Sequence, residues 1–180
     1  SGVKEVRVYS FNGKVNSASV NLGKAELAGK KIPCVWNEDK IVNKPVKIGG
    51  QDYKITLVNI GNPHCVVFSE KVDAVDVETV GPLFENCDYF PERINAEFIR
   101  VVNKVTIKMR VWERGNGETW SCGTGAAAAV VAAVLNGFCE KDTNITVKLR
   151  GGDLVVNYHS DGDVELMGSV KTVYEGKFEI

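Results

Sequence analysis

The sequence SCGTGAAAAVVAAVLNG, residues 121–137, contains the only segment of the chain that is rich in alanine and apolar on every side. Alanine is the strongest helix former, and Gly137 follows where a left-handed helix cap is common. These residues predict a helix from Gly125 to Asn136. Because this helix has no polar face, it has to be surrounded by protein. Strands wrapped around a central buried helix would provide that environment.

The rest of the chain has the pattern of short strands separated by turns. In VTIKMRVW, residues 105–112, apolar and polar positions alternate, as in a strand with one buried face; the apolar positions are Val105, Ile107, Met109 and Val111. YKITLVNI (53–60) follows the turn Gly49-Gly50, and Asp161-Gly162 separates two further strands as a hairpin turn. A second, shorter helix is predicted near Val77 to Phe84, interrupted by Gly81-Pro82. The predicted class is α+β.

Composition excludes several functions. The chain has 180 residues, 44% of them hydrophobic, which suits one compact domain or one domain with pieces of another. A net charge of -1 offers no attraction to nucleic acid or to an anionic membrane surface. The apolar run from Ala126 to Leu135 is too short for a membrane span, which needs about 20 residues. The first residues do not resemble a secretion signal, so we expect a cytoplasmic protein.

Five cysteines form an odd set without CxxC spacing, and the chain has only 2 histidines. This pattern argues against a disulfide framework and against a structural zinc site. Four of the cysteines lie in apolar or loop surroundings and are interpreted as core or loop residues; they are Cys34, Cys65, Cys87 and Cys139.

Cys122 has different surroundings. The polar segment ERGNGET leads to it, and the turn Gly123-Thr124-Gly125 with the predicted helix follows. The first turn of a helix has unpaired N–H groups and a partial positive charge, which favour a thiolate and a bound carboxylate. We therefore predict that the pKa of this thiol is lowered from about 8.5 toward neutrality. The alternative is a small buried cysteine beside glycines that only allow close packing.

Two further clusters contain polar side chains at turns. In GNPHCVVF, residues 61–68, Asn62 and His64 lie where one strand ends and the next begins. In FPERINAEF, residues 90–98, Arg93 and Asn95 precede a predicted strand. From spacing alone, the histidine is better explained by a structural hydrogen bond than by catalysis, and the second cluster indicates only a turn followed by a strand.

Taken together, GNPHCVVF, FPERINAEF and VWERGNGETWSCGTGAAAAVVAAVLNG resemble the diaminopimelate epimerase family in order and approximate spacing. VNLGKAELAGKKIP (20–33) and LRGGDLVV (149–156) are also similar to that family, so the resemblance covers nearly the whole chain. It implies an α+β fold of two similar domains, each with strands wrapped around a central helix. The active site would lie in the cleft between them.

The resemblance also implies the chemistry. Family members interconvert LL- and meso-2,6-diaminopimelate, for lysine and peptidoglycan precursor synthesis, without pyridoxal phosphate, metal or other cofactor. One cysteine thiolate removes the α-proton, and a thiol on the opposite face returns one; Cys122 matches one of the two. Gly123 and Thr124 match donors to the carboxylate of the reacting centre. His64 and Glu113 would tune the thiols, and four residues match contacts to the other end of the substrate: Asn62, Asn95, Glu113 and Arg114. A homodimer is also implied.

The sequence departs from the family in one respect, because nothing in it resembles the glycine- and asparagine-containing motif of the second cysteine. We expect residues 30–168 to form the carboxy-terminal epimerase-type domain. Residues 1–29 and 169–180 would be remnant strands of a truncated amino-terminal domain. On this interpretation the isolated chain is inactive.

Four other functions compete with that of a diaminopimelate epimerase. Another cofactor-independent isomerase of the same fold, such as a proline racemase relative, is possible, as is a non-catalytic binding fragment. A cysteine hydrolase would need an oriented pair of Cys122 and His64. A nucleotide loop is disfavoured because the GTG turn lacks the lysine of phosphate-binding loops.

Overall fold

The computed structural model describes residues 3–178. Its sheet contains eleven strands: β1 (Val6–Phe11), β2 (Lys14–Lys24), β3 (Lys44–Ile48), β4 (Gln51–Asn59), β5 (Pro63–Phe68), β6 (Asn95–Asn103), β7 (Thr106–Glu113), β8 (Gly117–Thr119), β9 (Asn144–Leu149), β10 (Gly152–Tyr158) and β11 (Asp163–Ser169). The helices are α1 (Val77–Glu85) and α2 (Gly123–Leu135), with short 3-10 turns at Gly29–Lys31 and Val72–Ala74.

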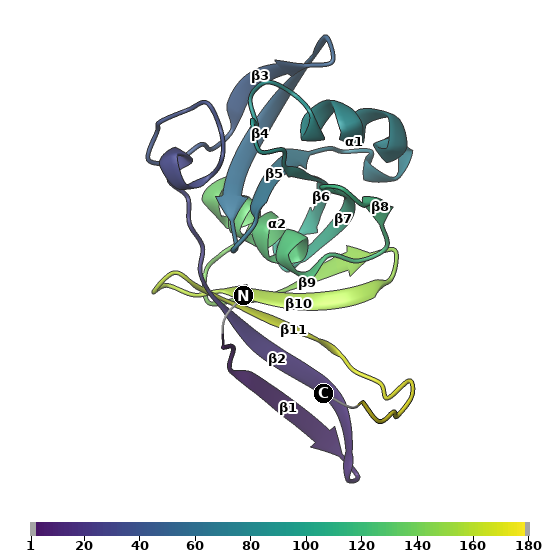
Figure 1. Cartoon of the computed structure of the whole chain (residues 1–180). Helices are drawn as coiled ribbons and strands as arrows, with labels where there is room; N and C mark the ends of the chain where they lie inside the picture. The colour runs from purple at the N-terminus through teal and green to yellow at the C-terminus, as the bar shows by residue number, and fades with distance from the viewer. Residues whose placement is uncertain (1–2, 179–180) are drawn as a thin grey trace.

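One mixed sheet connects all of these strands. Its order is β1-β2-β11-β10-β9-β7-β6-β5-β4-β3, with β8 added beside β7. Two neighbouring pairs are parallel, β5 with β6 and β7 with β9, and the other pairs are antiparallel. The part from β4 to β11 curves around α2 (Figure 1). This arrangement confirms the predicted α+β class.

The central helix α2 is buried as predicted. It packs against strands β4 to β7 and β9 to β11, and every residue from Gly125 to Ala133 is buried. It begins two residues earlier than predicted, at Gly123, and ends one residue earlier, at Leu135. Gly137 has φ +78°, so the left-handed residue expected after the helix is present.

Hydrophobic cores lie on both faces of the sheet. The period of two along each strand sends alternate side chains to opposite faces. In β6, for example, Ile99 packs in the core around α2, whereas Ala96 and Phe98 pack in a second core that includes Val77 and Phe84 of α1. The sheet is therefore covered on one face by α2 and over part of the other face by α1.

Several predicted elements are confirmed with small changes. β7 buries Ile107, Met109 and Val111, but Val105 precedes the strand and is exposed. β10 and β11 form the predicted hairpin, with Gly162 at φ +96° in its turn. The expected interruption of the second helix is wrong, because α1 continues through Pro82 to Glu85. Gly81 lets this helix approach β7 closely, since a Cβ there would lie 2.4 Å from the Trp112 ring.

At the amino-terminal end, β1 and β2 form a ribbon that extends away from the body of the molecule (Figure 1). β2 joins the sheet by pairing with β11. Every residue of β1 is exposed. Residues 170–178 form neither helix nor strand. No helix within residues 3–178 is long and apolar enough to cross a membrane.

Candidate active site

The predicted site residues gather at one edge of the curved sheet. β5 and β6 run parallel and begin there, and β7 runs the other way and ends there. Alternation along these strands turns His64, Glu97 and Glu113 to the same face as the core around α2. Cys122, at the start of α2, lies on that face. The structure thus brings together residues that are up to 58 positions apart, from His64 to Cys122.

Cys122 is the N-cap residue of α2. Its Sγ accepts a hydrogen bond from the Gly125 N–H at 3.3 Å and lies 3.7 Å from Thr124 Oγ1. The predicted lowering of its pKa is wrong: burial, with 7% of the residue exposed, raises the pKa of the thiol to about 11. The charge of Glu97 adds to this rise, and that of Glu113 adds less. The N–H of Gly125 and the hydroxyl of Thr124 favour the thiolate but do not outweigh burial.

Glu97 is the residue that the sequence reasoning missed. Its carboxylate is fully buried in β6, and Oε1 lies 2.7 Å from His64 Nδ1. On the other side of the ring, His64 Nε2 lies 3.0 Å from Asn62 Oδ1. Burial raises the pKa of Glu97, and the positive charge of His64 would oppose that rise. A carboxylate among the apolar residues Ala96, Phe98 and Ile99 was the available signal.

Asn95 connects two of the predicted segments. Its side-chain amide donates to the Pro63 carbonyl at 2.7 Å, and its Oδ1 accepts from the Arg114 N–H at 2.9 Å. The Arg114 guanidinium donates to the Glu92 carbonyl at 2.9 Å and is partly exposed. The turn after β7 is therefore fixed to the start of β6 through one buried asparagine.

The glycines of the turn allow close approach at the start of α2. A Cβ on Gly125 would lie 2.9 Å from Glu97 Oε1 and 3.1 Å from Cys122 Sγ, so the helix, the carboxylate and the thiol meet at this point. Gly123 faces Leu166 of β11, whose Cδ2 would be 2.9 Å from an added Cβ. Gly123 and Thr124 are partly exposed, so the first turn of α2 is accessible from one side.

Glu113 ends β7 on the same face, and the hydroxyl of Thr119 donates to its carboxylate. Thr119 belongs to β8, which pairs with β7. All predicted site residues except Arg114 therefore have side chains or amides in this single region, and Arg114 contributes its backbone to it.

The remaining cysteines lie elsewhere. Cys65 packs in the core next to α1, as do the half-buried Cys34 and Cys87. Cys139 follows the far end of α2. All five thiols are free. Across residues 3–178, no three His, Cys, Asp or Glu side chains are grouped as metal ligands would be.

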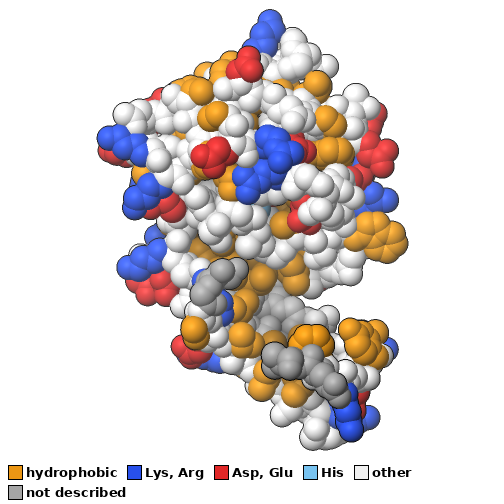
Figure 2. Space-filling model, in the orientation of Figure 1, with side chains coloured by type: hydrophobic (Ala, Val, Ile, Leu, Met, Phe, Trp, Pro, Cys, Tyr) orange, Lys and Arg blue, Asp and Glu red, His pale blue; other side chains and the backbone are white. Residues whose placement is uncertain are grey.

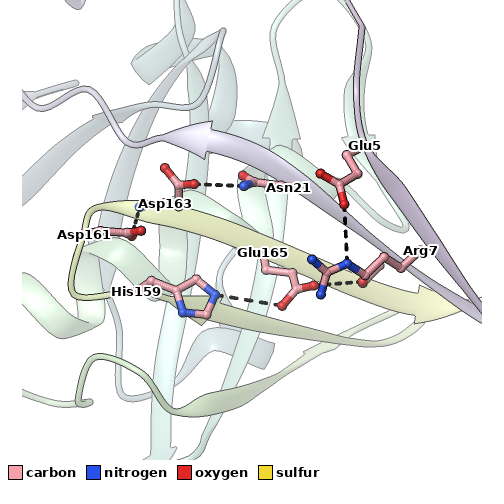
Figure 3. Close-up of a pocket in the computed structure, with 8 residues that line it drawn as sticks. Glu5, Arg7, Asn21, His159, Asp161, Asp163 and Glu165 are labelled. Atoms are coloured by element: carbon pink, nitrogen blue, oxygen red, sulfur yellow. Dashed lines mark hydrogen bonds and ion pairs between the residues drawn. The ribbon is translucent and has the colours of Figure 1, made fainter.

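A second polar region lies on the amino-terminal ribbon. A cavity of about 300 Å³ is lined there by residues of β1, β2 and β11 and of the hairpin before β11 (Figure 3). Most of its charged groups are acidic, and His159 lies 3.9 Å from Glu165 while Arg7 lies 3.6 Å from Glu5. It contains none of the predicted site residues.

Several solved structures with similar folds are racemases or epimerases. A probable proline racemase from Agrobacterium radiobacter superposes with a TM-score of 0.66 at 10% identity, covering 92% of this chain and 54% of that one. A hydroxyproline epimerase from Agrobacterium vitis superposes with a TM-score of 0.65 at 10% identity, covering 92% of this chain and 53% of that one. A predicted epimerase from Pseudomonas aeruginosa superposes with a TM-score of 0.53 at 15% identity, covering 97% of this chain and 69% of that one. The chain thus shares its α+β fold with these structures.

Sequence comparison identifies the family. The diaminopimelate epimerase family profile matches residues 56–173. A diaminopimelate epimerase from Bacillus licheniformis is 42% identical over 181 aligned residues, covering 100% of this chain and 64% of the relative. One from Pelotomaculum thermopropionicum is 44% identical over 178 residues, covering 99% and 63%. The chain belongs to the diaminopimelate epimerase family, a family of isomerases, and spans about 64% of the length of these relatives.

Proposed function

We propose that this chain is part of a diaminopimelate epimerase that interconverts LL- and meso-2,6-diaminopimelate by proton transfer at the α-carbon. Family membership supports the substrate class. The single observation that carries the chemistry is the position of Cys122, whose sulfur caps the first turn of α2 near the carboxylates of Glu97 and Glu113.

The first turn of α2 would bind the carboxylate of the reacting centre. The exposed sides of Gly123 and Thr124 lie next to Cys122, and helix N-termini bind anions through free N–H groups and the helix dipole. The same donors would stabilise the negative charge that moves onto this carboxylate when the α-proton leaves. Removing one such donor typically slows a reaction by a factor on the order of 10²–10³.

Cys122 acts as the proton donor when the reaction starts from the epimer whose α-hydrogen points toward the opposite cysteine. Its raised pKa keeps it a neutral thiol at neutral pH. A thiolate on the opposite face takes the α-proton, and Cys122 gives its S–H proton to the carbon. Cys122 is then a thiolate and the opposite cysteine a thiol, so the charge is conserved. In the reverse reaction the roles exchange.

The far end of the substrate, with its second amino-acid group, would be bound by Asn62, Asn95, Glu113 and Arg114. A guanidinium binds a carboxylate through two parallel hydrogen bonds, and the Arg114 side chain is partly exposed at the rim of the site. Asn95 fixes the backbone of Arg114, so this rim has a defined geometry.

In isolation the 180-residue chain should not turn over substrate, because a two-base reaction needs two thiols on opposite faces of one carbon. Among the described cysteines, only Cys122 lies in the site. Residues 30–168 would form one domain of the enzyme, and residues 1–29 and 169–180 would belong to the other. We further propose a cytoplasmic homodimer that needs no cofactor.

Solvent deuterium incorporation at the α-carbon tests the proposed reaction. A full-length protein of the family's usual length that contains this chain should exchange the α-proton of diaminopimelate. Cys122→Ala should reduce the exchange by a factor on the order of 10²–10⁴. Cys139→Ala, at the far end of α2, serves as the matched control and should retain activity.

Unchanged exchange in the Cys122→Ala enzyme would refute the role of this thiol. Exchange with proline but not with diaminopimelate would replace the proposed substrate by that of the competing racemase hypothesis. Measurable turnover by the 180-residue chain alone would contradict its proposed inactivity.

A further inference from the structure

The buried carboxylate of Glu97 has one oxygen that the fold leaves without a partner. Oε1 contacts His64 Nδ1 at 2.7 Å, but among residues 3–178 no group forms a hydrogen bond to Oε2. Both side chains of this pair are completely inaccessible to solvent. A buried carboxylate with an unpaired oxygen is destabilising, so its retention in the core needs a compensating role.

The position of Glu97 connects three parts of the site. It lies in β6, between His64 on β5 and the first turn of α2. Its Oε1 and the Cys122 sulfur both lie within about 3 Å of one point, the place of a Cβ on Gly125, at 2.9 and 3.1 Å. Gly125 therefore places no side chain between the carboxylate and the thiol.

We propose that Glu97 is a positioning residue of the epimerase site, which fixes the ring of His64 by a buried hydrogen bond and keeps Cys122 protonated by its charge. The proposal rests on the proposed function and extends it to a residue outside the predicted set. His64 is then held with Nδ1 toward Glu97 and Nε2 toward Asn62, in one orientation.

The groups around Cys122 act in opposite directions. Glu97 from β6 and Glu113 from β7 disfavour the thiolate, and the N–H of Gly125 and the hydroxyl of Thr124 on α2 favour it. His64 on β5 lies with Nδ1 2.7 Å from Glu97 Oε1. Because Glu97 contributes the larger of the two carboxylate effects, replacing it with a neutral amide should shift the balance toward the thiolate.

The test uses the 180-residue chain and does not depend on turnover. Glu97→Gln keeps the shape of the side chain and removes its charge. At about pH 8 the alkylation of Cys122 by iodoacetamide, located by peptide mass spectrometry, should become about tenfold faster, because the thiolate fraction rises tenfold for each unit by which the pKa falls. Cys34 and Cys87, half-buried in the other core, are internal controls and should react at unchanged rates.

Glu118→Gln is the matched variant. Glu118 is also a nearly buried carboxylate, but it pairs with Arg110 and Arg150 instead of lying beside Cys122. It should leave the Cys122 rate unchanged. Equal acceleration in both variants would attribute the effect to general loosening of the fold and would overturn the proposal, as would no acceleration in folded Glu97→Gln.

A measurement on the unmodified chain covers the case in which Glu97→Gln does not fold. Histidine-selective NMR should show a slowly exchanging proton between His64 Nδ1 and Glu97, and none for the partly exposed His159. Rapid exchange at His64 would refute the buried hydrogen bond. Failure of the epimerase assay with full-length protein would leave both results unchanged, so the two proposals are tested separately.

Discussion

At the scale of single residues, Cys122 shows why a helix terminus does not by itself acidify a thiol. The expected N–H donor is present, since the Gly125 nitrogen lies 3.3 Å from the Cys122 sulfur. It is outweighed because the sulfur is almost fully buried and because two carboxylates share its surroundings. Their distances in sequence, 25 and 9 residues from Cys122, hide this proximity until the strands are paired.

The raised thiol pKa predicts a loss of stability at alkaline pH. The pKa of this thiol is about 11 in the folded chain and 9.0 as the reference value, so the folded state favours the neutral thiol. The resulting contribution to the free energy of unfolding is complete below pH 9 and decreases as the pH rises toward 11. The contribution is at most about 3 kcal/mol, since one pH unit corresponds to about 1.4 kcal/mol. Urea unfolding of Cys122→Ser should show a shallower decline between pH 9 and 10.5 than the wild type. Parallel declines would contradict this.

Gly125→Ala should destabilise the chain although alanine is the better helix residue. The added methyl would lie 2.9 Å from the buried Glu97 carboxylate and 3.1 Å from Cys122 Sγ, and overpacking of this kind costs about 1–3 kcal/mol. Gly123→Ala is the control, because the side chain that it meets, Leu166, is partly exposed and can move. Chemical denaturation would measure both. A Gly125→Ala chain as stable as the wild type would show that the contact relaxes freely.

At the scale of elements, α2 and most strands could be predicted because each is encoded by its own residues. The alanine content predicted α2, and the alternation of apolar and polar residues predicted β7. The parallel pairing of β5 with β6 could not be predicted, since it depends on the crossover through α1. That pairing brings Val66 opposite Glu97 and so places Glu97 beside His64. Glu97 was therefore not predicted as a site residue, because the pairing of β5 with β6 was not predicted.

The connection of α1 to the turn after β7 predicts a large effect for Glu85→Ala. The buried carboxylate of Glu85 accepts hydrogen bonds from Trp112 Nε1 at 2.6 Å, the Gly115 N–H at 3.0 Å and Arg93 Nη1 at 3.1 Å. Removing it leaves the indole N–H of the partly buried Trp112 without its acceptor, at about 1–3 kcal/mol, whereas the exposed Arg93 and Gly115 can bond to water. We expect the free energy of unfolding to fall by about 1–3 kcal/mol and amide exchange at Gly115 to accelerate.

Glu78→Ala provides the comparison within the same helix. Glu78 is exposed in the first turn of α1, so its loss should cost less than about 1 kcal/mol. Glu85→Gln should lie between the two, because the amide oxygen can still accept. If Glu85→Ala and Glu78→Ala lose equal stability, the carboxylate does not anchor the turn.

At the scale of the whole molecule, burial is unevenly distributed. The body around α2 contains the two cores, whereas the ribbon of β1 and β2 exposes apolar side chains, among them Val8 and Phe11. Figure 2 shows such side chains, in orange, on the ribbon below the body. The segment after β11 adds exposed Val173 and Tyr174. Stability should therefore depend on the body, and the ribbon should open independently of it.

Amide hydrogen exchange of the 180-residue chain tests this gradient. Local opening requires only the free energy of the contacts that it breaks, and no residue of β1 is buried. Protection should therefore rise in the order β1, β2, β11 and α2, with β1 exchanging at least about a thousandfold faster than α2 after correction for intrinsic rates. Phe11→Ser, on the ribbon, should leave the melting temperature unchanged, whereas Val131→Ala, inside α2, should lower it. Equal protection in β1 and α2 would mean that the ribbon and the body unfold as one cooperative unit.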